Sequence, residues 1–137
     1  MIKAIFPGSF DPFHEGHRFV VKQALQDFDF IFIVVSWNEN KKRQNTFVKS
    51  KEEIEKMFSN EKDRIQVLIN EKELTTDLAK KLNCFNIIRG CRNEEDKFYE
   101  EKLKYKYLLL EKRLNFFYYF ANENTRNISS SNLKNKQ

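Results

Sequence analysis

The chain has 137 residues, a net charge of +5 and 40% hydrophobic residues, which indicates a single domain with a real hydrophobic core. Its 14 Phe and 5 Tyr exclude a disordered chain, and only three Gly and two Pro exclude a linker-like composition. No apolar run reaches the ~20 residues that span a bilayer, and no signal peptide is recognisable. Because the positive charge alone does not establish nucleic-acid binding, we expect neither a nucleic-acid nor a membrane partner.

Strands and helices are predicted to alternate along the chain. In order, they are a strand at residues 2–6, a helix at 17–26, a strand at 28–36, a helix at 51–58, a strand at 65–69, a helix at 73–82, a strand at 85–88, a helix at 94–113 and a strand at 114–120. Ser50 and Glu53 resemble a capping box, which predicts the start of the second helix at Lys51. A last helix is expected to begin at Ser129. The alternation predicts an α/β, Rossmann-like fold with a five-stranded parallel sheet flanked by helices.

The two cysteines, Cys84 and Cys91, lack the spacing of a CxxC motif and stand too isolated for a zinc site. We therefore expect free thiols in a reducing cytoplasm.

Four distinctive segments are predicted to follow strands: residues 7–17, 37–46, 89–92 and 122–131. In an open parallel sheet, ligands bind beyond the carboxyl ends of the strands. The topology therefore predicts that these four segments converge on one binding site.

The segment FPGSFDPFHEGH, residues 6–17, carries the strongest chemical signal. Gly8 allows the backbone to approach a phosphate closely, and Ser9 supplies a hydroxyl donor. His14 and His17 are the only histidines of the chain and stand three residues apart at a predicted helix start. A helix N-terminus offers free N–H groups to phosphate oxygens, and imidazoles there can stabilise charge that develops on them.

This segment resembles the HxGH/TxGH signature of the nucleotidyltransferase superfamily, with its upstream G-[ST]-F-D-P. The RGCR sequence at residues 89–92 resembles the RGxR element of the phosphopantetheine adenylyltransferase family, and Asp96, Tyr99 and Glu100 follow at that family's spacing. The ISSS sequence at residues 128–131 and the lysine pair at 41–42 resemble two further elements of it. These matches occur in the family's order over nearly the whole chain.

The resemblance implies a role for each matching residue. His17 would contact the α-phosphate and act in catalysis with Lys41 and Arg92, although the choice between Lys41 and Lys42 stays open. The implied ATP-binding residues are Ser9, Phe10, His17, Gly90, Arg92, Glu100, Asn124, Thr125, Arg126, Asn127, Ile128, Ser129 and Ser130. The implied acceptor-binding residues are Ser9, Lys41, Leu74, Thr75 and Arg89, of which Arg89 would bind the acceptor's phosphate.

The implied reaction is transfer of the adenylyl group of ATP to 4′-phosphopantetheine, giving dephospho-coenzyme A and pyrophosphate in coenzyme A biosynthesis. Mg²⁺ is expected as the cofactor, bound mainly by the triphosphate and water rather than by protein ligands. The resemblance further implies a cytoplasmic homo-oligomer, a hexamer in that family. Residues 1–137 would form a single nucleotidyltransferase domain that lacks the family's C-terminal helical segment.

Two alternatives stay open on the sequence alone. Because His14 stands where the family usually has Thr, the segment also resembles that of nicotinate or nicotinamide mononucleotide adenylyltransferases; cytidylyltransferases share HxGH but differ in their late motif. The second alternative is a catalytically inactive nucleotide-binding relative, suggested by the short C-terminal region.

Overall fold

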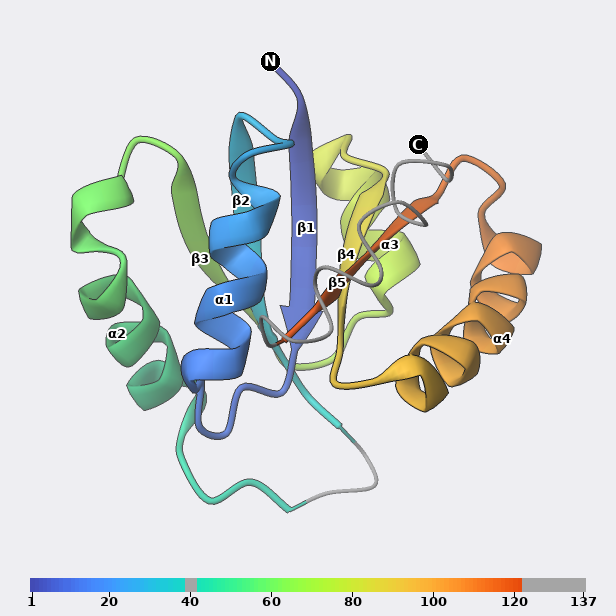
Figure 1. The fold of residues 1–137 in the computed structure, drawn as a ribbon. Helices are drawn as coiled ribbons and strands as arrows, with labels where there is room; N and C mark the ends of the chain where they lie inside the picture. The colour runs from blue at the N-terminus through green and yellow to red at the C-terminus, as the bar shows by residue number, and fades with distance from the viewer. Residues whose placement is uncertain (39–41, 122–137) are drawn as a thin grey trace.

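The computed structural model describes residues 1–38 and 42–121 of the chain. Its elements alternate in order (Figure 1): β1 (Lys3–Gly8), α1 (Glu15–Ala24), β2 (Phe30–Ser36), α2 (Phe47–Met57), the 3₁₀ turn η1 (Ser59–Glu61), β3 (Ile65–Asn70), α3 (Thr75–Leu82), β4 (Asn86–Cys91), α4 (Glu94–Leu110) and β5 (Asn115–Phe120). The predicted α/β fold, with a five-stranded parallel sheet flanked by helices, is confirmed. Among the described helices, none is both long and apolar enough to cross a membrane.

The strand order of the sheet determines where a ligand can bind. The five strands are parallel and lie in the order β3-β2-β1-β4-β5. The chain runs outward from β1 to β3 and then crosses back to place β4 on the other side of β1. This reversal creates a crevice beyond the carboxyl ends of β1 and β4, where ligands bind in open α/β sheets.

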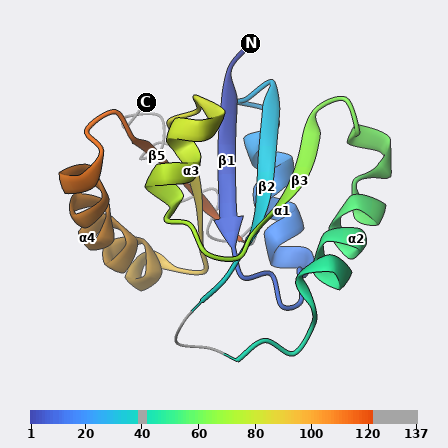
Figure 2. The same ribbon diagram turned by 180° about the vertical axis from the view of Figure 1, so that it is seen from behind.

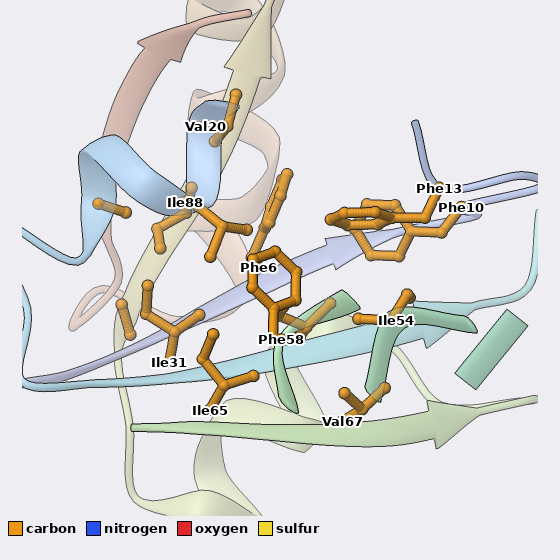
Figure 3. Close-up of a cluster of buried hydrophobic side chains, with 14 of the residues drawn as sticks. Phe6, Phe10, Phe13, Val20, Ile31, Ile54, Phe58, Ile65, Val67 and Ile88 are labelled. Atoms are coloured by element: carbon orange, nitrogen blue, oxygen red, sulfur yellow. The ribbon is translucent and has the colours of Figure 1, made fainter. Parts of the chain in front are cut away.

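Two hydrophobic cores cover the two faces of the sheet. Ala4 and Phe6 of β1 face α1 and α2, whereas Ile5 between them faces α3 and α4. The helices α1 and α3 lie in front of the sheet in Figure 1 and Figure 2, respectively, which are opposite views. The core on the α1 side is rich in phenylalanine (Figure 3). Because both faces are buried, the central strands consist of continuous apolar runs.

The start of α2 differs from the prediction. The helix begins at Phe47 rather than Lys51, because Thr46 is the N-cap residue and its side chain accepts a hydrogen bond from the Lys49 N–H at 3.0 Å. The predicted capping box at Ser50 was wrong. Ser50 lies buried inside the helix, and its hydroxyl accepts a hydrogen bond from Arg43 at 2.9 Å.

The end of β4 also differs, since the strand continues beyond Ile88 and pairs with β5 as far as Cys91. Cys84 and Cys91 are both free thiols, as expected, and the structure shows that both are buried. The helix predicted from Ser129 lies outside the described residues.

Candidate active site

A cavity of about 340 Å³ lies at the crevice between β1 and β4. It is lined by Phe6, Pro7, Gly8, Ser9, Phe10, His14, Gly16, His17, Val20, Arg89, Gly90, Cys91, Arg92, Asp96 and Ala121. His17 and Arg92 lie 75 positions apart in the sequence, yet both line this one cavity. The predicted convergence of residues 7–17 and 89–92 is thus confirmed.

The two histidines cap the start of α1 reciprocally. Nδ1 of His14 accepts a hydrogen bond from the Gly16 N–H at 3.1 Å, and Nδ1 of His17 accepts one from the His14 N–H at 3.1 Å. The two rings are stacked, with centroids 3.8 Å apart. Because Nδ1 of His17 is an acceptor, the neutral imidazole carries its proton on Nε2 and can donate it in a hydrogen bond.

Aromatic rings surround the His17 imidazole. The centroids of Phe10 and Phe13 lie 5.0 Å from that of His17, and the centroid of Phe6 lies at 6.5 Å. Burial among these rings, with a smaller contribution from His14, lowers the pKa of His17 to about 4. His17 is therefore a neutral hydrogen-bond donor at physiological pH.

Two glycines make room for the rings of this loop. A Cβ on Gly8 would lie 2.6 Å from the ring of Phe10, whose own backbone has a φ of 46°. A Cβ on Gly16 would lie 2.9 Å from Cε1 of His14. The glycines thus permit the ring arrangement that holds His17, in addition to any close approach of phosphate.

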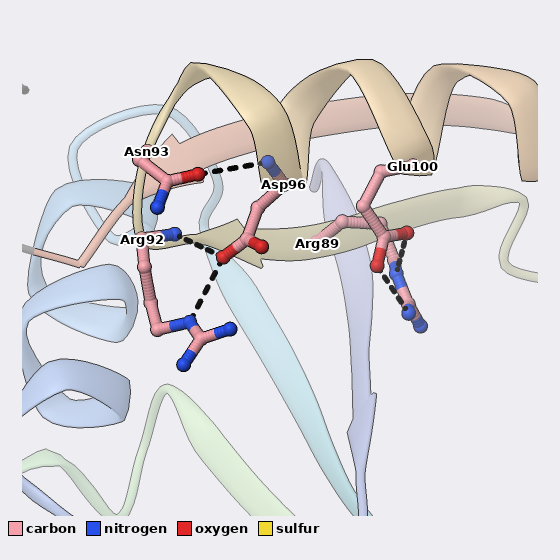
Figure 4. A network of polar contacts seen from close by, with 5 residues as sticks. All are labelled: Arg89, Arg92, Asn93, Asp96 and Glu100. Atoms are coloured by element: carbon pink, nitrogen blue, oxygen red, sulfur yellow. Dashed lines mark hydrogen bonds and ion pairs between the residues drawn. The ribbon is translucent and has the colours of Figure 1, made fainter.

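Arg89, near the end of β4, forms a bidentate ion pair with Glu100 (Figure 4). Its Nε and Nη2 donate to the two carboxylate oxygens of Glu100 in α4 at 2.8 and 2.9 Å. The two side chains are 25% and 15% exposed. Both oxygens of Glu100 are directed at Arg89, so Glu100 fixes the guanidinium at the edge of the cavity.

Arg92 lies in a more open environment three residues later. Its side chain is 82% exposed and donates from Nε to Asp96 at 2.9 Å (Figure 4). Asn93 caps α4, since its side chain accepts a hydrogen bond from the Asp96 N–H at 2.9 Å. The hydrogen bond from the Arg92 side chain is the main cause that lowers the pKa of Asp96.

A second cavity, of about 410 Å³, adjoins the first. Its lining residues are Pro7, Gly8, Ser9, Ser36, Trp37, Asn38, Thr75, Arg89 and Tyr107. Four of these residues, Pro7, Gly8, Ser9 and Arg89, also line the cavity that contains His17. The end of β1 and Arg89 therefore stand between two spaces, each large enough for part of a substrate.

A third cavity, of about 370 Å³, brings the segment after β2 to the same edge of the sheet. It is lined by Ser9, Asp11, Asn38, Lys42, Arg43 and Gln44. The prediction that residues 37–46 approach the site is thus confirmed for the described part of that segment. No role was predicted for Asp11, Arg43 or Trp37. Asp11 lies in the G-[ST]-F-D-P motif but had no assigned chemistry, and Arg43 and Trp37 belong to no recognised motif.

The structure places the remaining predicted residues as follows. Thr75 lines the second cavity, whereas Leu74 is 52% exposed and is not among the lining residues of that cavity. Phe10 and Gly90 line the first cavity. Lys41, Asn124, Thr125, Arg126, Asn127, Ile128, Ser129 and Ser130 lie outside the described residues.

The described part of the chain shows no cluster of metal-ligating side chains. Within residues 1–38 and 42–121, no group of three or more His, Cys, Asp or Glu side chains is arranged to hold a metal ion.

Comparison with known proteins identifies the class and then the family. The Cytidylyltransferase-like family model matches residues 5–136, so the chain is a nucleotidyltransferase of this class. A lipopolysaccharide core biosynthesis protein from Thermoplasma volcanium shares the fold, with a TM-score of 0.63 at 19% identity over 86% of this chain and 95% of its own.

Relatives with higher sequence identity identify the family within this class. The phosphopantetheine adenylyltransferases of Mycoplasma capricolum and Mycoplasma mycoides are 38% and 37% identical to this chain. The alignments cover 96% and 98% of this chain and 93% and 95% of those proteins. That of Lactobacillus gasseri is 37% identical over 98% of this chain and 80% of its own length. The chain belongs to the phosphopantetheine adenylyltransferase family, and the mononucleotide alternative is not favoured.

Proposed function

We propose that this chain transfers the adenylyl group of ATP to 4′-phosphopantetheine, giving dephospho-coenzyme A and pyrophosphate. The observation that carries this proposal is the pair of adjoining cavities that share Pro7, Gly8, Ser9 and Arg89. A two-substrate transfer needs two binding spaces that meet where the bond is made. The relatives' names supply the chemical identity of the two substrates.

The residues of each cavity support an assignment of the substrates. The cavity with His17 and Arg92 suits a triphosphate, because it combines a cation, a neutral N–H donor and the N-terminus of α1. The cavity with Thr75 and Arg89 suits the acceptor, whose phosphate Arg89 would bind beside Ser9. Ser9 lines both cavities, so its hydroxyl can reach both substrates.

The proposed reaction is a direct in-line transfer. An oxygen of the acceptor phosphate bonds to the α-phosphorus of ATP, the bond from that phosphorus to the bridging oxygen breaks, and pyrophosphate leaves. The acceptor phosphate is already a nucleophile near neutral pH, so no general base is needed. Catalysis then depends on alignment and on stabilising charge at the α-phosphate. The proposed donor is Nε2–H of His17, a role supported by the acceptor state of its Nδ1 and by its low pKa. Lys41 is proposed to assist from outside the described residues.

We propose that Mg²⁺ arrives with the triphosphate rather than in a protein cage. The cation would neutralise part of the charge on the phosphate chain.

A pyrophosphate-release assay tests the proposal. The chain is incubated with ATP, Mg²⁺ and, separately, 4′-phosphopantetheine, nicotinate mononucleotide or nicotinamide mononucleotide. We expect pyrophosphate release with 4′-phosphopantetheine, and mass spectrometry should identify dephospho-coenzyme A. Release with a mononucleotide instead would contradict the proposed acceptor, and ATP binding without release for any acceptor would indicate an inactive relative.

We also propose a cytoplasmic homo-oligomer, a hexamer as the family resemblance implies. Phe98, Tyr99, Tyr105, Leu109 and Leu110 of α4 are each more than half exposed in the single chain. Apolar side chains gathered on one helix are typical of a subunit interface. Light scattering of the purified chain measures the oligomeric state, and a monomer would contradict this part of the proposal.

A further inference from the structure

The Arg43 side chain donates hydrogen bonds to backbone and side-chain acceptors of the protein, including the Ser9 carbonyl. Its Nη1 donates to the Ser9 carbonyl oxygen at 2.7 Å, its Nε to the Asn45 carbonyl at 3.0 Å and its Nη2 to the Ser50 hydroxyl at 2.9 Å. The guanidinium carbon also lies 4.3 Å from the ring centroid of Phe47. One planar side chain therefore joins the end of β1 to the segment before α2 and to α2 itself.

Asp11 makes the reciprocal connection from the loop after β1. Its carboxylate accepts hydrogen bonds from the Gln44 N–H at 2.6 Å and from both the backbone N–H and the side-chain amide of Asn45 at 2.9 Å. These bonds lower the pKa of Asp11, with the Gln44 N–H as the largest cause. Residues 43–45 and residues 9–11 are thus connected in both directions.

The position of this connection matters because Ser9 lines all three cavities at the site. The carbonyl of Ser9 is fixed by Arg43, and the next residue, Phe10, has its ring against Gly8 and His17. A shift of the Ser9 backbone would therefore move a residue that lines both proposed substrate spaces. A misplacement of about 1 Å in a reacting group can reduce a rate about 100-fold.

We propose that Arg43 is a positioning residue for the adenylyl transfer: it holds Ser9 in register with the loop that carries Lys42, and does not itself bind a substrate phosphate. The proposal rests on the proposed function for its kinetic consequence. Its structural consequence, the attachment of residues 43–45 to residues 9–11, can be measured without any activity. The direction of each guanidinium nitrogen toward a protein acceptor is what separates this role from phosphate binding.

The chain supplies a matched control in Arg64. Its guanidinium also makes three hydrogen bonds, in this case all to backbone carbonyls. Nε donates to Asp29 at 3.2 Å, and Nη2 donates to Leu25 and Phe28 at 2.6 and 2.8 Å. These acceptors precede β2, at the amino end of the sheet and away from the cavities. Lysine retains the charge in either position but cannot reproduce the planar arrangement of donors.

The experiment compares Arg43→Lys with Arg64→Lys in the full chain. We expect a similar fall in Tm for both variants, because each loses a comparable set of hydrogen bonds. Only Arg43→Lys should lower kcat, by about 10- to 100-fold, with each KM changed less than about threefold. Hydrogen exchange at the Gln44 and Asn45 amides should become at least about fivefold faster in Arg43→Lys and stay unchanged in Arg64→Lys.

Three results would overturn the proposal. One is a kcat for Arg43→Lys equal to that of Arg64→Lys, and another is a raised KM with an unchanged kcat, which would make Arg43 a binding residue. The third is unchanged exchange at Gln44 and Asn45, which is informative even if the wild-type chain shows no adenylyl transfer. If Arg43→Lys does not fold, Asp11→Ala breaks the same connection from the other side and is expected to give the same kinetic and exchange pattern.

Discussion

The histidine side and the arginine side of the cavity between β1 and β4 are built from different interactions. On the histidine side, His17 is enclosed by phenylalanine rings and fixed by a backbone N–H. On the arginine side, Arg89 and Arg92 are fixed by the carboxylates of Glu100 and Asp96. Apolar enclosure keeps the imidazole neutral, whereas the carboxylate partners hold the permanently charged guanidinium groups in place. One cavity can therefore combine a neutral hydrogen-bond donor with two cations.

The largest effect should come from the histidine side. We expect His17→Ala to lower kcat at least about 100-fold, which corresponds to about 3 kcal/mol of transition-state stabilisation. The reason is that the variant lacks the Nε2–H donor that we propose for the α-phosphate. Steady-state pyrophosphate release measures the change, and circular dichroism verifies the fold.

His14→Asn is the matched control, because asparagine retains a side-chain acceptor for the Gly16 N–H at the N-cap position. We expect its kcat to stay within about fivefold of wild type. Turnover of His17→Ala within threefold of wild type would remove His17 from the mechanism.

Much of this site could be predicted from the sequence, because short motifs determine it locally. The pattern of glycine, serine and histidine in residues 8–17 predicted a phosphate site at a helix start, and strand–helix alternation predicted where it lies. Both depend on neighbours within a few residues. The placement of His17 and Arg92 on one cavity followed from the topology of parallel sheets rather than from either motif.

The remaining features depend on contacts between distant segments, which a single sequence does not display. Ser50 has the spacing of a capping residue, but its hydroxyl is taken by Arg43 from a different segment, and Thr46 caps the helix instead. The low pKa of His17 likewise arises from rings that pack only in the fold. The ion pair between Arg89 and Glu100 joins the end of β4 to α4, eleven residues later in the sequence.

On the arginine side, the more enclosed pair should contribute most to stability. We expect Glu100→Gln to reduce the free energy of unfolding by about 2 kcal/mol, since it leaves Arg89 largely enclosed without a charged partner. That corresponds to a fall in Tm of roughly 5–10 °C. Thermal unfolding measures this change, and the KM for the acceptor should rise as the Arg89 guanidinium loses its fixed position. An unchanged Tm would show that the pair is not a structural support of the site.

The enclosure of His17 also predicts a specific pH dependence. NMR titration of its Cε1–H should give a midpoint near pH 4 rather than 6.5. Because the unfolded chain binds this proton more readily, the contribution of neutral His17 to stability is present above about pH 6.5 and is lost as the pH falls to about 4. His17→Ala should therefore flatten the pH dependence of stability in that window. A midpoint near 6.5 would mean that the phenylalanine rings do not exclude water from the imidazole.

The smallest effect should come from Asp96→Asn, which removes the carboxylate beside Arg92 and leaves the rest of the arginine side unchanged. The Arg92 side chain is 82% exposed, so water replaces the lost partner and screens the charge. We expect a Tm close to that of wild type, measured under the same conditions as for Glu100→Gln, and a kcat changed less than about threefold. A fall in Tm as large as that of Glu100→Gln would contradict the expectation that the exposed pair contributes less to stability than the enclosed pair. A small fall supports a division in which Glu100 holds Arg89 in an enclosed ion pair, while Arg92 makes an exposed ion pair with Asp96 that an incoming triphosphate could replace.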